Sequence, residues 1–310
     1  MTPFEGVLVV DKPAGPTSHD VVEEVRQFTG RLRVGHTGTL DPFATGVLPL
    51  CVGRATRLSR FLTAARKLYA GAIRLGVTTD TYDSGGRVMA TRGVEGLSAT
   101  QVREAAARFA GAQMQAPPPF SARKINGQPM HRLARRGIEV PLTPVPVTIF
   151  RLDILECAGG VVRFEVETSP GTYVRSLAHD LGEVLGCGAH LEQLRRLASG
   201  SFTAEVAHPL SEVRASGSRG ALDEIGIGLN DLDLGLPAVT TTPDGAAAMR
   251  HGRTLTVLDI VPGQAAAADA GPFPGAVRVE DERGNLLGVA IRTTTPEGEL
   301  TFRPAVVLAS

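Results

Sequence analysis

Apolar and polar positions alternate along the chain in patterns that predict strands and helices in an irregular order. Residues 6–10 are uniformly apolar, which is typical of a short buried strand. Between residues 18 and 30 the valines fall on one face of a helix, which Ser18 can cap and Gly30 can end. Residues 162–167 alternate between apolar and charged side chains, as a half-buried strand does. This order, without a regular strand–helix–strand repeat, predicts an α+β fold.

Residues 116–146 differ from the segments on either side of them. Prolines stand at both ends, and no acidic residue occurs before Glu139. We interpret the segment as an inserted basic arm that could reach over an anionic ligand, although a solvated loop with one short helix would be equally basic. The basic residues of this arm are Arg123, Lys124, Arg132, Arg135 and Arg136.

The composition changes again after about residue 230. Residues 262–275 consist mostly of Pro, Gly and Ala, which is typical of a loop. Short apolar runs at 277–279, 286–291 and 300–307 then predict strands around turns. We therefore expect a main domain over residues 1–232, with the arm inserted at about 116–146, and a small β-rich domain over residues 233–310.

The composition is that of a globular protein with a sizeable core, because 43% of the 310 residues are hydrophobic and 21% are charged. No apolar run approaches the ~18 residues of a membrane span, and the N-terminus does not show the pattern of a signal peptide. The three cysteines are far apart and form no CxxC pair. We therefore expect neither a disulfide framework nor a zinc site, and we expect a cytoplasmic location.

Charge leaves the class of partner open, because 32 basic and 32 acidic residues cancel over the whole chain. Residues 201–310 hold 8 Arg and no Lys against 14 Asp and Glu, which gives them a net charge of −6 and leaves +6 for residues 1–200. The terminal part is thus unlike a typical phosphate-binding surface. Whether it contacts a nucleic acid stays open.

The glycine-rich loop at 35–46 is the most unusual stretch of the sequence. Its glycines permit close approach of the backbone, and Pro42 disfavours a helical conformation at Asp41. A carboxylate held on such a rigid loop is suited to act as a nucleophile or a base. Taken alone, however, an Asp-Pro pair is more often a turn, and a histidine such as His36 is more often structural than functional.

This loop belongs to a longer run, GHTGTLDPFATGVLPLCVGRATR, which closely resembles motif II of the TruB family. That family comprises bacterial tRNA pseudouridine synthases that act on uridine 55 in the T loop. Further segments resemble motifs of the family in the same order, at residues 10–13, 67–69, 121–124, 136–141, 171–182 and 190–197. The resemblance spans residues 6–212. It implies a mixed-sheet pseudouridine synthase catalytic domain with an RNA-gripping insertion, followed by a small PUA-like domain.

The resemblance implies a catalytic role for three residues. Asp41 matches the family's indispensable aspartate, which can attack ribose C1′ or remove a ribose proton, and both routes stay open. Arg175 matches the arginine that pairs with this aspartate and holds it ionised. Tyr69 matches the tyrosine that stacks on the uracil and can help remove the C5 proton. The reaction exchanges an N1–C1′ bond for a C5–C1′ bond, so we expect no cofactor and no metal.

The resemblance also implies residues that bind the RNA. Leu194 matches an apolar residue against the uracil, and Lys12 matches a lysine that supports the N-terminal loop near the pocket. The uridine must leave the folded T loop, and His36 matches the histidine that takes the vacated position. The arm would clamp the stem through its basic residues, with His131 where the family often has tyrosine or another ring.

Three functions remain open. The first is an enzyme that isomerises uridine 55 in the T stem-loop of tRNA, as a monomer with no obligate protein partner and no membrane. The second is a synthase guided by small RNAs and partner proteins, although this chain does not show the extended basic tails of that group. The third is a tRNA-binding folding chaperone in which catalysis is secondary. Only the first predicts turnover of an isolated T-arm hairpin.

Overall fold

The computed structural model describes residues 4–30, 32–120, 142–264 and 273–308, and the backbone of 124–125 and 128–129. The chain divides into two compact units. The first unit comprises residues 1–40, 47–65 and 200–310, and the second comprises residues 41–46 and 66–199. The domain boundary expected at residue 232 lies within the first unit and stays a prediction.

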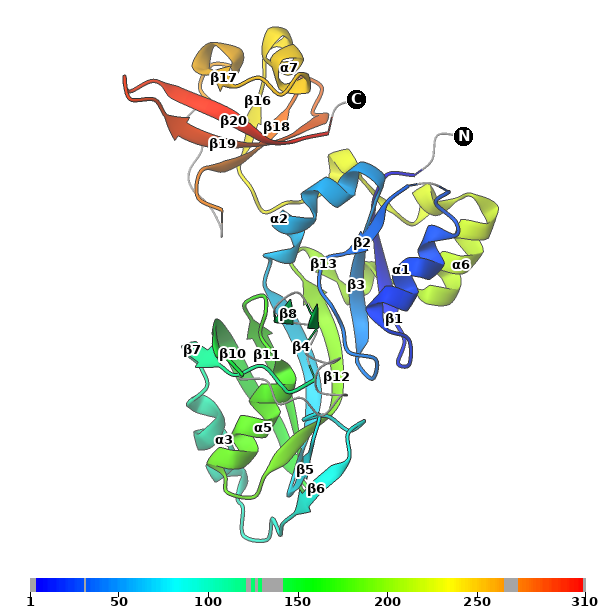
Figure 1. Ribbon diagram of the computed structural model, residues 1–310, viewed down its shortest axis with the longest axis vertical. Coiled ribbons are helices and arrows are strands. Elements are labelled where there is room, and N and C mark those ends of the chain that lie inside the picture. The colour runs from blue at the N-terminus through cyan, green and yellow to red at the C-terminus, as the bar shows by residue number, and fades with distance from the viewer. Residues whose placement is uncertain are drawn as a thin grey trace. The chain divides into compact units, whose positions relative to one another are not determined.

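The second unit is built on a sheet with the strand order β12-β4-β11-β10-β7, in which all neighbours are antiparallel. Helices α3 and α5 contact each other, and they pack against β10 and β12, respectively (Figure 1). The strands are β4 (Lys67–Leu75), β7 (Gly111–Gln115), β10 (Val145–Ala158), β11 (Val161–Thr168) and β12 (Ala189–Ser199), and the helices are α3 (Ala99–Ala107) and α5 (Val174–Val184). Two small antiparallel pairs join β5 (Val77–Thr79) to β6 (Val88–Thr91) and β8 (Lys124–Ile125) to β9 (Gln128–Pro129).

The sequence pattern accounts for the faces that these elements bury. In β11, Val162, Phe164 and Val166 are almost fully buried, and the charged residues between them belong to the opposite face. Helix α5 likewise buries Leu177 and Leu181. The predicted half-buried strand and the α+β class are both confirmed.

The first unit contains a second group of strands with mixed directions. Strand β1 (Gly6–Lys12) pairs in parallel with β14 (His208–Pro209) and antiparallel with β15 (Ile227–Gly228), and β2 (Val34–His36) pairs antiparallel with β3 (Thr45–Val52). Its other described elements up to residue 231 are α1 (Ser18–Arg26), α2 (Ser59–Thr63), α6 (Leu210–Arg219), β13 (Phe202–Thr203) and the 3₁₀ turns η1 (Gly53–Leu58), η2 (Ala204–Val206), η3 (Leu222–Glu224) and η4 (Leu229–Asp231).

The start of α1 differs from the prediction, because Thr17 and not Ser18 is the N-cap. The Thr17 side chain accepts a hydrogen bond from the Asp20 N–H, and the Asp20 carboxylate accepts one from the Thr17 N–H. Ser18 is buried, and its Oγ accepts from the Leu40 N–H at 2.8 Å and donates to the Leu40 carbonyl at 3.1 Å. Ser18 therefore fastens the residue that immediately precedes Asp41.

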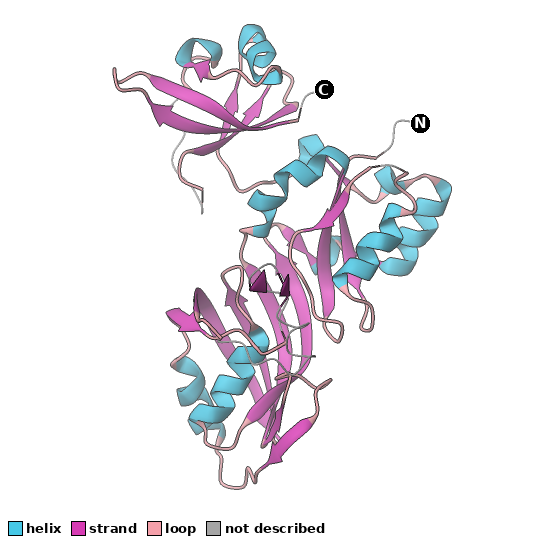
Figure 2. Cartoon of the chain, viewed as in Figure 1, coloured by secondary structure: helices cyan, strands magenta, loops and turns pink. Residues whose placement is uncertain are grey.

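Residues 238–308 contain a sheet of their own (Figure 2). Its five strands follow the order β16-β18-β19-β20-β17, and its core lies around Val239, Met249 and Phe302. This observation confirms the β-rich terminal segment that the sequence predicts. No described helix combines the length and the apolar character that a membrane-spanning helix needs. The elements are β16 (Ala238–Thr240), α7 (Pro243–Arg250), β17 (Leu255–Thr256), η5 (Val257–Asp259), β18 (Ala276–Glu280), β19 (Leu286–Thr294) and β20 (Leu300–Val307).

The loop that carries Asp41 joins the sheet at Gly46. Thr45 and Gly46, the first residues of β3, pair in parallel with Arg195 and Arg196 of β12. Gly46 has a φ of +101°, and a Cβ atom at this position would lie 2.2 Å from the Arg196 carbonyl oxygen. Only glycine permits both this conformation and this close approach. The register of β3 on β12 therefore requires glycine here.

We expect Gly46→Ala to lower the free energy of unfolding by at least about 2 kcal/mol, because the variant combines backbone strain with a steric clash. Gly96→Ala is the matched control, since Gly96 has a φ of +90° and no non-neighbouring atom within 4 Å of the added methyl group. The control should cost about 1 kcal/mol. Urea unfolding of both variants measures the difference, and equal losses would contradict the steric argument.

Candidate active site

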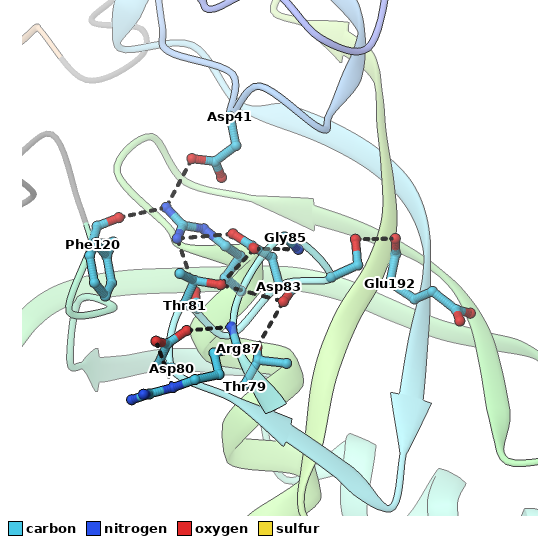
Figure 3. Close-up of polar contacts among 11 residues, drawn as sticks. Asp41, Thr79, Asp80, Thr81, Asp83, Gly85, Arg87, Phe120 and Glu192 are labelled. Atoms are coloured by element: carbon cyan, nitrogen blue, oxygen red, sulfur yellow. Dashed lines mark hydrogen bonds and ion pairs between the residues drawn. The ribbon is translucent and has the colours of Figure 1, made fainter. Parts of the chain in front are cut away.

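An ion pair between Asp41 and Arg175 lies at the centre of the site (Figure 3). Arg175 Nη2 donates a hydrogen bond to Asp41 Oδ1 at 2.9 Å. The Arg175 side chain is 7% exposed, and that of Asp41 is 31% exposed. Arg175 is the second residue of α5, whereas Asp41 begins the short segment that leads to Gly46. The fold thus brings together two residues that lie 134 positions apart in the chain.

The guanidinium of Arg175 has three further acceptors. Nη2 also donates to the Phe120 carbonyl at 3.0 Å, and Nη1 donates to the Thr81 carbonyl at 3.0 Å and lies 3.3 Å from Asp83 Oδ2. Together with Asp41, these acceptors match the four N–H bonds of the two terminal nitrogens. A buried cation is costly unless it is paired and hydrogen-bonded. The arrangement therefore compensates the charge of Arg175 and fixes its orientation.

Asp83 is a site residue that the sequence analysis missed. Its Oδ2 faces Arg175, and its Oδ1 accepts hydrogen bonds from Thr81 Oγ1 at 2.7 Å and from the Gly85 N–H at 3.0 Å (Figure 3). Asp83 is buried, so it acts as a fixed counter-ion, and Asp41 is the more exposed carboxylate of the two. An aspartate two residues before a glycine is typical of a turn, and the sequence gives no sign that this one is buried against an arginine.

Hydrogen bonds on either side of Arg175 fasten the beginning of the stretch from Gln115 to Phe120. Gln115, the last residue of β7, accepts from the Tyr173 N–H at 2.8 Å and donates to the Tyr173 carbonyl at 3.1 Å. Ser176 Oγ donates to the carbonyl of residue 116 at 2.8 Å. These contacts hold the end of β7 against the beginning of α5, so the Phe120 carbonyl is presented to Arg175 by a fixed segment.

Tyr69 and Leu194 lie on one face of the sheet. Tyr69 of β4 pairs with Arg196 of β12, which is two residues beyond Leu194. Paired residues share a face, and so do residues two apart on a strand. Arg196 also pairs with Gly46 of β3, so Gly46, Arg196 and Tyr69 form one row across β3, β12 and β4. The loop that carries Asp41 therefore enters the sheet at the row of Tyr69.

Comparison with known proteins identifies the family. Residues 26–174 match the TruB family pseudouridylate synthase N-terminal domain, and residues 175–225 match the tRNA pseudouridylate synthase B C-terminal domain. The tRNA pseudouridine synthase B of Thiobacillus denitrificans is 43% identical over 286 residues, which cover 92% of this chain and 91% of that protein. The chain belongs to the TruB family of pseudouridylate synthases.

Further comparisons agree with TruB membership. The tRNA pseudouridine synthase B of Solibacter usitatus is 43% identical over 250 residues, which cover 81% of this chain and 85% of that protein. The crystal structure of a Cbf5–Nop10–Gar1 complex contains a chain that is 26% identical, with a TM-score of 0.75, and the match covers 98% of this chain and 84% of that one. The mixed α+β pseudouridine synthase fold, with its terminal β-domain, is therefore confirmed, and the protein is an isomerase of this family.

Two further residues that the TruB resemblance singled out belong to the first unit. Lys12 is fully buried, and its Nζ donates to the carbonyls of Pro13 and Pro16 at 2.8 Å each. His36 ends β2, and its Nδ1 accepts from the Gly38 N–H at 3.3 Å. The side chain of Lys124 lies outside the described part of the chain. The other expected RNA-gripping residues lie outside it entirely: Arg123, His131, Arg132, Arg135 and Arg136.

The described residues include no group of three or more His, Cys, Asp or Glu side chains placed to hold a metal ion. The chemistry that the site offers is that of a rigidly held carboxylate beside a buried guanidinium. Such a carboxylate can act as a nucleophile or as a base, because its position is fixed before substrate arrives.

A buried lysine lies on the same face of β4 as Tyr69. Lys67 is 5% exposed and is two residues before Tyr69 on this strand. Burial, and then the charge of Arg196, lowers the pKa of the Lys67 ammonium from 10.5 to about 8. Near neutral pH the folded protein thus carries a buried charge that the unfolded chain exposes to water. Lys67 therefore makes an unfavourable contribution to stability that depends on pH.

We expect the stability difference between wild type and Lys67→Met to shrink as the pH rises from about 8 to 10.5. In this range the folded protein has released the Lys67 proton, whereas the unfolded chain still binds it, so higher pH favours the folded wild type. Below about pH 8 both states are protonated and the difference should be constant. Urea unfolding at several pH values measures the difference in unfolding free energy between the two proteins. A difference that does not change with pH would contradict the argument from burial of Lys67.

We expect Asp83→Asn to lower the rate of pseudouridine formation by roughly 10-fold or more, because it leaves the buried Arg175 with one carboxylate instead of two. Binding of RNA should be unchanged. Asp80→Asn is a matched control in the same loop, since Asp80 accepts from the Arg87 N–H at 2.8 Å (Figure 3). Single-turnover rates of both variants test this, and equal effects would refute a specific role for Asp83.

Proposed function

We propose that the protein is a tRNA pseudouridine synthase that isomerises uridine 55 in the T loop of tRNA to pseudouridine. Relatives that are 43% identical are named tRNA pseudouridine synthase B, and one match covers 92% of the chain. The observation that carries the proposal is the Asp41–Arg175 ion pair, which lies within the region that matches the TruB family. The choice of uridine 55 follows from the resemblance of the motifs around these residues.

In the proposed reaction Asp41 acts on the ribose of the target uridine. Its carboxylate attacks C1′, or it removes a ribose proton to give a glycal-type intermediate, while the N1–C1′ bond breaks. Arg175 favours the ionised form of Asp41 and holds its orientation through a charge-assisted hydrogen bond. The released uracil turns within the pocket, and C5 bonds to C1′ as the Asp41–C1′ bond breaks or, in the glycal route, as Asp41 returns the proton to the ribose. C5 then loses its proton while N1 gains one. The atoms balance without an oxidant or a reductant.

Tyr69 and Leu194 form the proposed pocket for the uracil. The Tyr69 ring stacks on the base, and its hydroxyl assists removal of the C5 proton. Leu194 supplies apolar contact beside it, which their shared sheet face supports. Lys12 supports the N-terminal loop, which agrees with its two carbonyl contacts.

The RNA must place its uridine in this pocket, and we propose base flipping for that step. Extraction of a base from a folded loop costs a few kcal/mol of lost stacking. His36 would fill the vacated position, and the basic arm would grip the stem through phosphates. A monomer that acts in the cytoplasm without an obligate partner, and a main domain that ends at residue 232, also remain part of the proposal.

A guided synthase that works with partner proteins is the second candidate, and the fold match to a chain of the Cbf5–Nop10–Gar1 complex, an assembly of several proteins, supports it. The higher identity to proteins named tRNA pseudouridine synthase B supports the stand-alone enzyme instead. A folding chaperone would need RNA binding but not the Asp41 carboxylate. The three candidates therefore differ in whether the purified chain turns over an isolated hairpin.

We expect the purified protein to release tritium from a T-arm hairpin that is labelled at C5 of uridine 55. Asp41→Asn should lower the rate by at least about 1,000-fold, because it removes the carboxylate that acts on the ribose. Asp153→Asn is the matched control, since Asp153 is a half-exposed carboxylate paired with Arg151 in the same unit. Its rate should equal that of wild type.

Each other outcome contradicts part of the proposal. Wild-type protein that binds the hairpin without releasing tritium would exclude the stand-alone enzyme and favour the guided synthase or the chaperone. Release by Asp41→Asn at the wild-type rate would exclude Asp41 as the reacting group. Equal release from a hairpin labelled only at another uridine would refute the choice of position 55.

A further inference from the structure

The stretch from the end of β5 toward β6, here called the 79–86 loop, contains Tyr82 between Thr81 and Asp83. The carbonyl of Thr81 and the carboxylate of Asp83 both contact Arg175 Nη1. Within the described part of the chain, Tyr82 is the only residue other than glycine with a positive φ, at +63°. L-residues rarely adopt this conformation unless their surroundings enforce it. The placement of Thr81 and Asp83 thus depends on a strained residue between them.

The Tyr82 ring stacks face to face on His179 of α5. The ring centroids are 3.8 Å apart, and the planes differ by 4°. His179 lies four residues after Arg175, so one helical turn separates the stacked ring from the guanidinium. The stack therefore joins the strained point of the loop to the helix that carries Arg175.

The ring face, and not a hydrogen bond, accounts for this contact. His179 Nδ1 is buried and has no hydrogen-bond partner among the described residues. Burial, with Asp180 and Glu183 nearby, raises the pKa of the Tyr82 phenol, so the ring stays neutral. The backbone of Tyr82 itself is also held, because the Leu191 N–H of β12 donates to the Tyr82 carbonyl at 3.0 Å.

We propose that the Tyr82–His179 stack positions Asp83 and the Thr81 carbonyl against Arg175, and thereby sets the orientation of the Asp41–Arg175 pair. Neither ring is a catalytic residue, since each acts through the 79–86 loop. The inference rests on the proposed function for its effect on the reaction. Its structural content, the control of the Arg175 environment, holds independently of the substrate.

The test separates the ring from the strained backbone. Tyr82→Gly suits the positive φ but removes the ring, His179→Ala removes the other half of the stack, and Tyr82→Phe keeps it. We expect the first two variants to lower the single-turnover rate on the T-arm hairpin by about 3- to 10-fold, which is the range that loss of one aromatic pair gives. Hairpin affinity should stay within about 2-fold, and Tyr82→Phe should match wild type.

Two controls distinguish positioning from a general structural effect. Phe150→Ala removes the exposed ring that stacks with Arg66 in the same unit and should leave the rate unchanged. In an Asp83→Asn background, His179→Ala should cause a smaller loss than in the wild-type background, because the part of the effect that passes through Asp83 is already removed and only the part that passes through the Thr81 carbonyl remains. Unimpaired rates in both ring variants, or a full additional loss in the Asp83→Asn background, would overturn the inference.

A readout without substrate keeps this inference separate from the proposed function. In the side-chain ¹⁵N spectrum of the whole protein, the Nη resonances of a guanidinium held by four acceptors are separate, and faster rotation merges them. We expect Tyr82→Gly and His179→Ala to merge the Arg175 signals, and Tyr82→Phe to keep them apart. Merging without any tritium release by wild type would refute the proposed function alone, whereas unchanged signals would refute the positioning role.

Discussion

Arg175 carries a full positive charge in a place that is almost closed to water, and the site is arranged to compensate that charge. Its terminal nitrogens donate to Asp41 and to two carbonyls, and they form a second ion pair with Asp83. Asp41 and Phe120 come from separate stretches of the chain, and Thr81 and Asp83 flank Tyr82 in one loop. The buried guanidinium requires all four to be in place together. The hydrogen bond between Arg175 and Asp41 therefore fixes the orientation of both side chains.

The fold supplies these acceptors through independent attachments. Gly46 sets the row at which the Asp41 loop joins β12, in register with Tyr69. Gln115 ties the end of β7 to the residue that caps α5. The 79–86 loop is held at Tyr82, whose carbonyl accepts from β12 and whose ring stacks on His179. A carboxylate positioned in this way needs little reorganisation when a ribose is presented to it.

The sequence predicts the parts of this arrangement that depend on local pattern or on whole motifs. The alternation around Phe164 predicts a half-buried strand, and the Asp41 loop stands out by its glycines and its Asp-Pro pair. The pattern could not predict Asp83, because its burial against Arg175 is a tertiary contact. It also misplaced the α1 cap, since Ser18 and its neighbour Thr17 are chemically alike and only the backbone at Leu40 distinguishes them. The roles of Tyr69, Leu194 and the arm rest on resemblance and stay predictions.

The most direct test of the central role of Arg175 is the single-turnover rate of Arg175→Lys on the labelled T-arm hairpin, measured together with hairpin affinity. Lysine keeps the charge, but its three N–H bonds cannot reach four acceptors in the planar arrangement of a guanidinium. We expect a rate at least about 100-fold below wild type with hairpin affinity unchanged. A rate near that of wild type, or a loss that is explained entirely by weaker binding, would contradict it.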